Sequence, residues 1–277
     1  MIDYAYYNGI ITPYDACCIP LSDRSIFFGD SVYDVILGRN KTPYQPEEHL
    51  ERLYANAASI GLILPSYDEV REAIESLIRE SGATDFMLYI QLSGYGYRRT
   101  HARADNRSNL LITLTETHIP EKLCYVKAIT ESDSRHAYCN VKTTDLLPAV
   151  LSATGAEARG ADVSIFVKDG YVTECSAANI SLLRDRLLIT HPLDSSILPG
   201  ICERNLVDIC HGLGIGHEVR PFGEDELFLA DAVLVTSTTK LIRQCTEING
   251  KELVMNDAEL PNTIFSLMWK DLADKTR

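Results

Sequence analysis

Two stretches of the chain each mix strand-like and helical patterns, and the second stretch begins after residue 117. In the first stretch, apolar runs at 4–7 and 10–11 flank Asn8-Gly9, a dipeptide that favours a tight type I′ hairpin turn. The spacing of apolar residues then predicts two helices and three more strands, at 46–61, 67–81, 32–37, 86–92 and 110–115. The first stretch is therefore expected to contain both strands and helices.

Pro120 marks a break, and the mixed pattern starts again behind it. The elements expected there are helices at 148–160, 200–212 and 262–273, a hairpin of 163–167 and 171–174, and strands at 180–183, 187–190 and 232–236. A chain of 277 residues with 45% hydrophobic content can bury more than one core. We therefore expect a two-domain α/β (α+β) fold, divided into residues 1–117, a linker at 118–122, and a larger domain at 123–277.

The charge balance excludes two classes of partner. A net charge of -13 repels nucleic-acid phosphates and anionic lipid surfaces. Met1-Ile2-Asp3-Tyr4 lacks the basic start of a signal peptide, and no apolar run approaches the roughly 20 residues that cross a bilayer. The eight cysteines form no CxxC pair and no metal-ligand spacing. We expect a cytoplasmic protein with reduced thiols and no metal, nucleic acid or membrane partner.

Lys142 is the first candidate for chemistry. It follows Cys139-Asn140-Val141 and precedes a polar stretch before the helix expected from residue 148, so it is interpreted as an inward-pointing residue at the end of a strand. A desolvated lysine has a lowered pKa, and its free amine can form an imine with an aldehyde. On spacing alone, an ordinary surface lysine remains the alternative.

Glu174 is the second candidate. It lies at the end of a predicted hairpin strand and is followed by small residues from Cys175 to Ala178. A carboxylate opposite a pyridine nitrogen keeps that nitrogen protonated, and small neighbours let a flat ring approach the backbone. A partly exposed glutamate at a strand end is the simpler alternative.

Several segments could bind a phosphate. Leu198-Pro199-Gly200-Ile201-Cys202 leads into a helix, whose first N–H groups attract an anion. Ser237 and Thr238 lie in a run of hydroxyl residues behind an apolar strand, and Arg52 on the first long helix could add a charge. Each motif alone is also typical of helix caps, turns and exposed helix positions.

A loop with Arg98, Arg99, His101 and Arg103 concentrates positive charge in an acidic chain. Such a cluster could bind a substrate carboxylate, particularly through a bidentate arginine. A solvated loop without a ligand is the alternative.

Taken in order, these segments resemble the fold-type IV pyridoxal phosphate enzymes, which include D-amino-acid aminotransferases, branched-chain aminotransferases and aminodeoxychorismate lyases. The resemblance extends from Tyr7 to about Ile248. Its most specific stretches are Asp23-Arg24-Ser25, Phe28-Gly29-Asp30-Ser31-Val32-Tyr33, His49-Leu50-Glu51-Arg52-Leu53, Lys142 with Leu146-Leu147-Pro148, Val172-Thr173-Glu174 with Asn179, Ile197-Leu198-Pro199-Gly200-Ile201, and Thr236-Ser237-Thr238-Thr239.

The resemblance implies pyridoxal 5'-phosphate as cofactor. Lys142 would form the Schiff base and carry the proton between the substrate Cα and the cofactor C4′, and Glu174 would face the pyridine nitrogen. The residues that would bind the phosphate or support the ring are Arg52, Leu198, Ile201, Cys202, Ser237 and Thr238. The family often has threonine where Cys202 stands, so a hydroxyl contact is lost while the backbone N–H remains.

The resemblance also implies two α/β domains with the cofactor at their junction, and a homodimer in which the Arg99 loop reaches the neighbour's site. Lys142 would belong to the larger C-terminal domain. A monomer is then expected to be nearly inactive.

Tyr33 and Arg99-Thr100-His101 match the carboxylate-binding residues of the D-amino-acid aminotransferases. The expected substrates are a D-amino acid such as D-alanine and a 2-oxo acid such as 2-oxoglutarate. The sequence departs from that branch at Leu37, where its members carry a lysine, and in a loop one residue longer from Gly94. The choice between Arg98 and Arg99 as the carboxylate ligand stays open.

Three alternatives remain at this point. Thr173-Glu174-Cys175 with Ala177-Ala178-Asn179 is more similar to the aminodeoxychorismate lyases, which release pyruvate and form p-aminobenzoate. A branched-chain aminotransferase ranks third, because Val35 and Leu37 stand where a glycine and arginine pattern is usual. A cofactor-bound protein without turnover is the alternative from another functional class.

Overall fold

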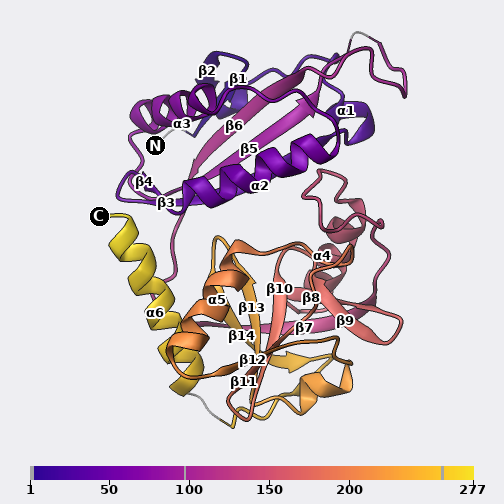
Figure 1. Cartoon of the computed structure of the whole chain (residues 1–277), viewed down its shortest axis with the longest axis vertical. Helices are drawn as coiled ribbons and strands as arrows, with labels where there is room; N and C mark the ends of the chain where they lie inside the picture. The colour runs from indigo at the N-terminus through magenta and orange to yellow at the C-terminus, as the bar shows by residue number, and fades with distance from the viewer. Residues whose placement is uncertain (1–2, 97, 257–258) are drawn as a thin grey trace. The chain divides into compact units, whose positions relative to one another are not determined.

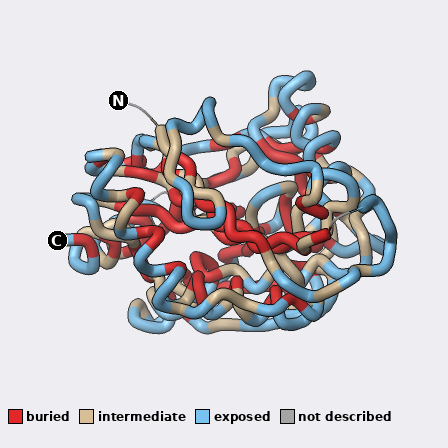
Figure 2. Tube along the Cα trace, turned by 90° about the horizontal axis from the view of Figure 1, so that it is seen from above, coloured by how far each residue is buried: buried red, intermediate tan, exposed pale blue. Residues whose placement is uncertain are grey.

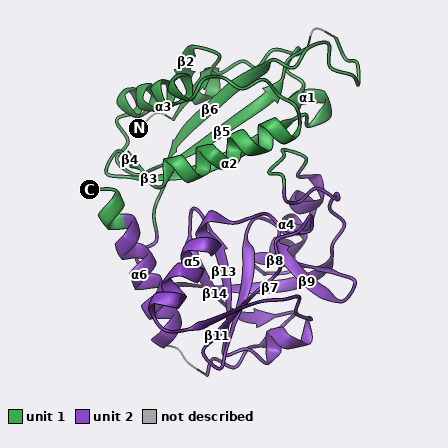
Figure 3. Cartoon of the chain, viewed as in Figure 1, with its two compact units in different colours: residues 1–119, 141–145, 273–277 green, residues 120–140, 146–272 purple. Residues whose placement is uncertain are grey.

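The computed structural model describes residues 3–96, 98–256 and 259–277. They divide into two compact units, residues 1–119, 141–145 and 273–277 in the first and residues 120–140 and 146–272 in the second (Figure 3). The division after Ile119 falls inside the linker predicted at 118–122. The segment that carries Lys142 groups with the first unit, although the sequence places it in the C-terminal domain.

The first unit contains an antiparallel sheet in the order β2-β1-β6-β5-β3-β4 (Figure 1). Its strands are β1 (Tyr4–Tyr7), β2 (Ile10–Pro13), β3 (Ser31–Arg39), β4 (Thr42–Pro43), β5 (Phe86–Gly94) and β6 (Ser108–Glu116). A short helix, α1 (Ser25–Phe28), precedes β3. Asn8 and Gly9 both have positive φ, 45° and 95°, as a type I′ turn requires, so the predicted β1–β2 hairpin is confirmed.

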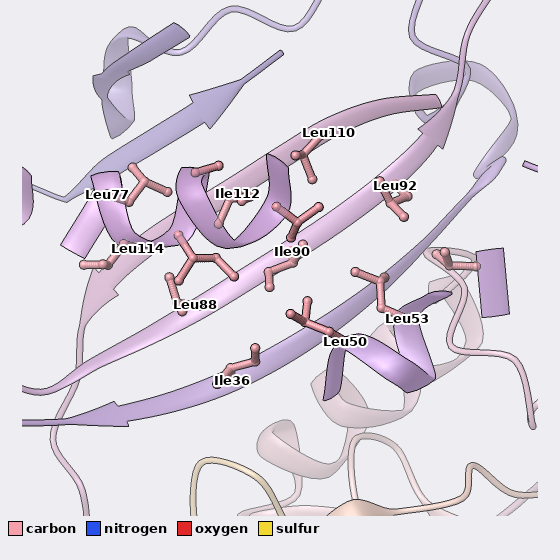
Figure 4. Packing of buried hydrophobic residues seen from close by; sticks show 14 of the residues in the cluster. Ile36, Leu50, Leu53, Leu77, Leu88, Ile90, Leu92, Leu110, Ile112 and Leu114 are labelled. Carbon is pink, nitrogen blue, oxygen red and sulfur yellow. The ribbon is translucent and has the colours of Figure 1, made fainter. Parts of the chain in front are cut away.

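Two amphipathic helices, α2 (Pro46–Ser59) and α3 (Tyr67–Ser81), belong to the first unit and share its core. Their buried leucines pack with isoleucines of the sheet, as Figure 4 shows for Leu50, Leu77, Ile90 and Ile112. The side chain of Ser66 accepts a hydrogen bond from the Glu69 amide in a capping box that fixes the start of α3. The predicted bounds 67–81 are confirmed.

The segment 141–145 lies along β3. The amide of Tyr33 donates to the Lys142 carbonyl at 2.9 Å, and the Thr144 amide donates to the Ser31 carbonyl at 3.2 Å. Lys142 lies in irregular chain and follows no strand. The interpretation of Lys142 as a strand end is therefore wrong, although its position shortly before a helix, α4 (Leu147–Ala158), is confirmed.

The second unit contains a larger mixed sheet. Among the described residues its order is β12-β11-β10-β13-β14-β7-β8-β9, with β15 paired to β14. The strands are β7 (Cys124–Ser132), β8 (Val163–Lys168), β9 (Tyr171–Cys175), β10 (Asn179–Arg184), β11 (Leu187–Thr190), β12 (Gly216–Val219), β13 (Ala232–Ser237), β14 (Leu241–Ile248) and β15 (Lys251–Glu252). The β8–β9 hairpin turns at Asp169-Gly170, as predicted. No strand was predicted at β7 or β14.

Helices α4, α5 (Ile201–Gly212) and α6 (Glu259–Lys275) complete the chain. Buried residues, red in Figure 2, concentrate in the strands, and exposed residues concentrate in turns and on outer helix faces. The second core packs apolar residues of β8, β9, β13 and β14, among them Ile165, Val172 and Val235. Within the described ranges, no helix is long and apolar enough to cross a bilayer.

Candidate cofactor site

Lys142 and Tyr33 lie together in the first unit. The Lys142 Nζ lies 4.4 Å from the centre of the Tyr33 ring, whose other neighbour, Tyr89, stacks on it at 5.1 Å. The electron-rich face of a tyrosine attracts an ammonium group. The structure therefore holds the amine of Lys142 in a defined place beside a phenol.

Arg52 is fixed by a buried carboxylate on β3. Its Nε and Nη2 donate to the two oxygens of Asp34 at 2.8 Å each, and the His49 ring nitrogen Nδ1 lies 2.8 Å from the same carboxylate. Burial alone would raise the pKa of Asp34, but hydrogen bonds from His49 and Arg52 outweigh it and hold the pKa well below its usual range. Arg52 thus keeps a charged, oriented guanidinium, whereas an exposed helix position was the simpler expectation.

Glu174 is buried in the second unit, with 6% of its surface exposed. One carboxylate oxygen accepts from Arg135 Nη1, and the other accepts from the Leu198 amide at 3.1 Å and from Asn179 Nδ2 at 3.3 Å. The alternative of a partly exposed glutamate is therefore wrong.

Arg135 makes further contacts around its guanidinium. It donates to Asp133 Oδ2 at 2.7 Å and to the Ser196 carbonyl at 2.9 Å, and its guanidinium lies 4.6 Å from the centre of the Phe166 ring. Burial lowers the pKa of Arg135, but the hydrogen bond to Asp133 and the charges of Glu174 and Asp133 outweigh it and raise the pKa. A permanent cation therefore faces Glu174.

The start of α5 presents backbone donors. Its N-cap residue, Gly200, has no side chain that could accept from the first N–H groups. A Cβ at Gly200 would lie 2.0 Å from Asn179 Oδ1, so the close approach of Asn179, which also donates to the Leu198 carbonyl at 2.8 Å, requires glycine there. The first N–H groups of the helix and the positive end of its dipole suit an anion.

The turn behind β13 lies beside this helix start. The Cys202 thiol donates to the Leu241 carbonyl at 3.0 Å, and the Ser237 amide lies by the same sulfur. Thr236 Oγ1 is buried without a hydrogen-bond partner among the described residues. The second unit therefore brings the start of α5, with Ile201 and Cys202, close to the hydroxyl run that contains Ser237 and Thr238. The backbone N–H groups and hydroxyls of these residues fit a phosphate.

The arginine-rich loop splits into two parts. Arg98, Arg99 and His101 are exposed, as a ligand-binding loop requires. Arg103 instead turns inward, donating to the Asp30 carboxylate and, through Nη1, to the Ile60 carbonyl at 2.6 Å. Within the predicted cluster, Arg103 therefore makes structural contacts, whereas the other three residues are exposed.

The comparison with known families decides the assignment. The sequence pattern described as Amino-transferase class IV matches residues 31–248. The chain belongs to this family. A D-alanine aminotransferase of Listeria monocytogenes serotype 1/2a is 34% identical over 253 residues, which cover 89% of this chain and 87% of that protein. A D-alanine aminotransferase of Bacillus licheniformis is 32% identical over 251 residues, 89% of each chain.

The fold agrees with the family. The crystal structure of the branched-chain amino acid aminotransferase of Escherichia coli has a TM-score of 0.90 at 21% identity, covering 100% of this chain and 97% of that chain. The predicted membership, the mixed α/β fold and the aminotransferase class are confirmed. Class IV aminotransferases use pyridoxal phosphate, so the predicted cofactor is confirmed too. The roles of single residues stay predictions.

Glu203 is a further buried carboxyl in the first turn of α5. It is 6% exposed and accepts a hydrogen bond from Ser181 Oγ at 3.0 Å. Burial raises its pKa from the ordinary value of 4.5 to about 7, and the nearby charge of Glu174 acts in the same direction. Between these two pH values the folded chain binds more protons at Glu203 than the unfolded chain does.

Stability should therefore fall as pH rises from 4.5 to about 7, by up to about 3 kcal/mol from this group. Glu203→Gln keeps an acceptor for Ser181 but carries no charge, so its stability should lack this decline. Urea unfolding at pH 5, 6, 7 and 8 measures the free energy of unfolding of the parent and of Glu203→Gln. Glu72→Gln, on the exposed face of α3, is the control. Equal pH slopes for parent and Glu203→Gln would contradict the assignment.

Proposed function

We propose that the chain is a D-amino-acid aminotransferase, which moves the amino group of a D-amino acid such as D-alanine to a 2-oxo acid such as 2-oxoglutarate in two half-reactions. The observation that carries this proposal is the similarity to D-alanine aminotransferases over 89% of the chain. Tyr33, Arg99 and His101, which match the carboxylate-binding residues of that branch, support it.

When bound, the cofactor supplies an aldehyde that takes up the amino group and a ring that withdraws electrons from the substrate Cα. Lys142 would hold the cofactor through its Nζ. Once the substrate amine has taken its place, this Nζ would carry the proton between the substrate Cα and the cofactor C4′. The contact of this Nζ with the Tyr33 ring supports a fixed starting position for the amine.

Glu174 keeps the pyridine nitrogen protonated. Arg135 supports this role, because its guanidinium contacts the Glu174 carboxylate and an opposite charge favours the ionised form of a carboxyl group. In the second unit, the first N–H groups of α5 and the hydroxyls of Ser237 and Thr238 are the proposed phosphate donors, and Leu198 is the proposed support for the ring. In the first unit, Arg52 is the proposed charged donor. The loss of a hydroxyl at Cys202 leaves the backbone donor in place.

We propose a homodimer as the working form. Large apolar side chains are exposed near the start of the first unit, where Ile10, Leu21 and Phe27 are 66%, 73% and 44% exposed. Leu147 and Leu151 on α4 of the second unit are 64% and 63% exposed. Monomers seldom expose such groups together, whereas a symmetric partner would cover them.

The cysteines support a cytoplasmic location. All eight are free thiols, which suits the reducing cytoplasm.

The proposal is tested by steady-state kinetics with D-alanine and 2-oxoglutarate. Double-reciprocal plots at several acceptor concentrations should be parallel, as a two-step exchange requires, and L-alanine should be at least about 100-fold less effective by kcat/KM. Aminodeoxychorismate serves as the alternative substrate. Pyruvate and p-aminobenzoate from that compound, with no transfer from D-alanine, would overturn the proposal in favour of the lyase.

A further inference from the structure

The loop that carries Arg99 and His101 has little regular backbone structure to hold it. In the described parts of residues 95–107, neither a helix nor an extended strand is present. Backbone hydrogen bonds within sheets or helices therefore do not fix the positions of Thr100 and His101. Side-chain contacts have to supply that order.

Arg24 supplies the most direct of these contacts. Its Nη1 donates to the Thr100 carbonyl and its Nη2 to the His101 carbonyl, each at 2.7 Å. Its third nitrogen, Nε, donates to Asp30 at 2.6 Å. Arg24 is 5% exposed and each of its three guanidinium nitrogens donates to the protein, so the residue has little surface for a substrate.

Asp30 links Arg24 to the far side of the loop. Its carboxylate also accepts from Arg103 Nε at 2.9 Å, and Arg103 is bound in turn to the Ile60 carbonyl. These charge-assisted hydrogen bonds keep the pKa of Asp30 low, even though burial alone would raise it. Arg24 therefore fixes the loop at residues 100–101, and Asp30, which both arginines contact, fixes it at Arg103.

Phe28 provides a ring around which the same groups gather. The guanidinium carbons of Arg24 and Arg99 lie 4.5 Å and 5.3 Å from its centre, and the His101 ring lies 5.5 Å away. Both proposed carboxylate ligands therefore rest on one aromatic side chain that Arg24 also contacts. A change in the position of Arg24 would reach Arg99 and His101 through Phe28 and through the loop backbone.

Two glycines leave the space that Arg24 occupies. A Cβ at Gly94 would lie 2.9 Å from Asp30 Oδ2 and 3.2 Å from Arg24 Cδ, and a Cβ at Gly96 would lie 3.4 Å from Arg24 Cγ. The backbone is fixed at the same point, because the Arg24 amide donates to the Gly94 carbonyl at 3.0 Å. The packing around the arginine stem is therefore as specific as its hydrogen bonds.

We propose that Arg24 is a positioning residue for substrate recognition, and that it holds Arg99 and His101 in the arrangement that binds the substrate carboxylate. This inference rests on the proposed function, because it takes Arg99 and His101 to be the carboxylate ligands. Arg24 acts through the Thr100 and His101 carbonyls, and Asp30 acts through Arg24 and Arg103.

Arg24→Lys tests the proposal in the holoenzyme. Lysine keeps the charge beside Asp30 but cannot donate to two carbonyls in the fork geometry of arginine. The KM for D-alanine should rise at least about tenfold, while kcat stays within about threefold and the cofactor dissociation constant is unchanged. Propanoate, which is D-alanine without its amino group, should inhibit this variant at least about tenfold more weakly.

Arg107→Gln is the matched control. Arg107 lies in the same loop, where its guanidinium pairs with Asp105 and lies 4.4 Å from the centre of the Tyr95 ring. The KM of the Arg107→Gln variant for D-alanine should stay within about twofold of the parent value. Gly94→Ala is the second variant, because it displaces the Arg24 side chain without removing any charge, and it should raise KM in the same direction as Arg24→Lys.

A double-mutant cycle with Arg99→Ala separates the possible outcomes. If Arg24 acts through the loop, Arg24→Lys should raise the KM of the Arg99→Ala variant by a smaller factor than it raises the KM of the parent, and the remaining effect should come through His101. Full additivity, or an unchanged KM in Arg24→Lys while Arg99→Ala is impaired, would overturn the inference and leave the proposed function intact. A parent enzyme without activity on D-alanine would overturn the proposed function itself.

Discussion

Lys142→Ala is expected to reduce turnover of D-alanine by at least about 10³-fold. The variant loses both the amine that holds the aldehyde and the base that moves the Cα proton, and no second lysine is placed on the Tyr33 ring in the described residues. Cofactor that still binds would do so only through its phosphate and ring contacts. The fold should be retained, because Lys142 lies in irregular chain and contributes its backbone carbonyl, which alanine also has, to the contact with β3.

Mass spectrometry after borohydride treatment measures the covalent attachment independently of activity. In the parent, the cofactor mass should be fixed on the peptide that contains residue 142, and in Lys142→Ala it should be absent. Lys168→Ala, which removes an exposed lysine at the end of β8, is the matched control and should keep the label. A label on a different lysine, or an active Lys142→Ala enzyme, would contradict the assignment.

Two substitutions of Glu174 should separate its effect on stability from its effect on catalysis. Glu174→Ala removes one of the two carboxylate partners of the Arg135 guanidinium, which keeps Asp133, so we expect a loss of about 1–3 kcal/mol in the free energy of unfolding. Glu174→Gln keeps an oxygen that can accept from Arg135 and should lose less stability. Both variants lack the carboxylate that keeps the pyridine nitrogen protonated, so kcat should fall about 10²-fold or more in each.

Urea unfolding of the two variants without cofactor gives the stability difference, and kcat with D-alanine gives the catalytic one. The absorbance spectrum of the cofactor-loaded variants adds a readout that does not depend on turnover. Exposed Glu72→Gln serves as a control for the loss of one carboxylate. If Glu174→Gln were as active as the parent, the pyridine role of Glu174 would be untenable, even with Arg135 in place.

Local patterns predicted much of the fold. The capping box at Ser66 and the glycine at 82 define α3 to the residue, and Asn8-Gly9 and Asp169-Gly170 locate two hairpins. β7 was not predicted, because exposed and buried residues do not alternate regularly along Cys124–Ser132. Its neighbours in the sheet, β8 and β14, are parallel to it, and such pairings leave no turn signal in the sequence.

The candidate site was predictable where a short motif carries it. Glu174 and the Gly200 helix start are recognisable from their immediate neighbours. Arg135, Asp34 and Arg24 were missed as supporting residues, because each acts on a group far along the chain. Arg135 and Glu174 are 39 positions apart, and Arg24 and Thr100 are 76 apart. Asp34 and His49 did carry a signal, since a charged residue in an apolar strand and a histidine on an apolar helix face need buried partners.

The most direct test of the central claim is the amount of pyruvate released when the cofactor-loaded enzyme meets D-alanine without any 2-oxo acid. An aminotransferase can complete only its first half-reaction, so we predict a single equivalent of pyruvate per bound cofactor, conversion of the cofactor to its amine form, and renewed release once 2-oxoglutarate is added. L-alanine should give almost none. Continuous pyruvate formation from aminodeoxychorismate, with none from D-alanine, would contradict the account.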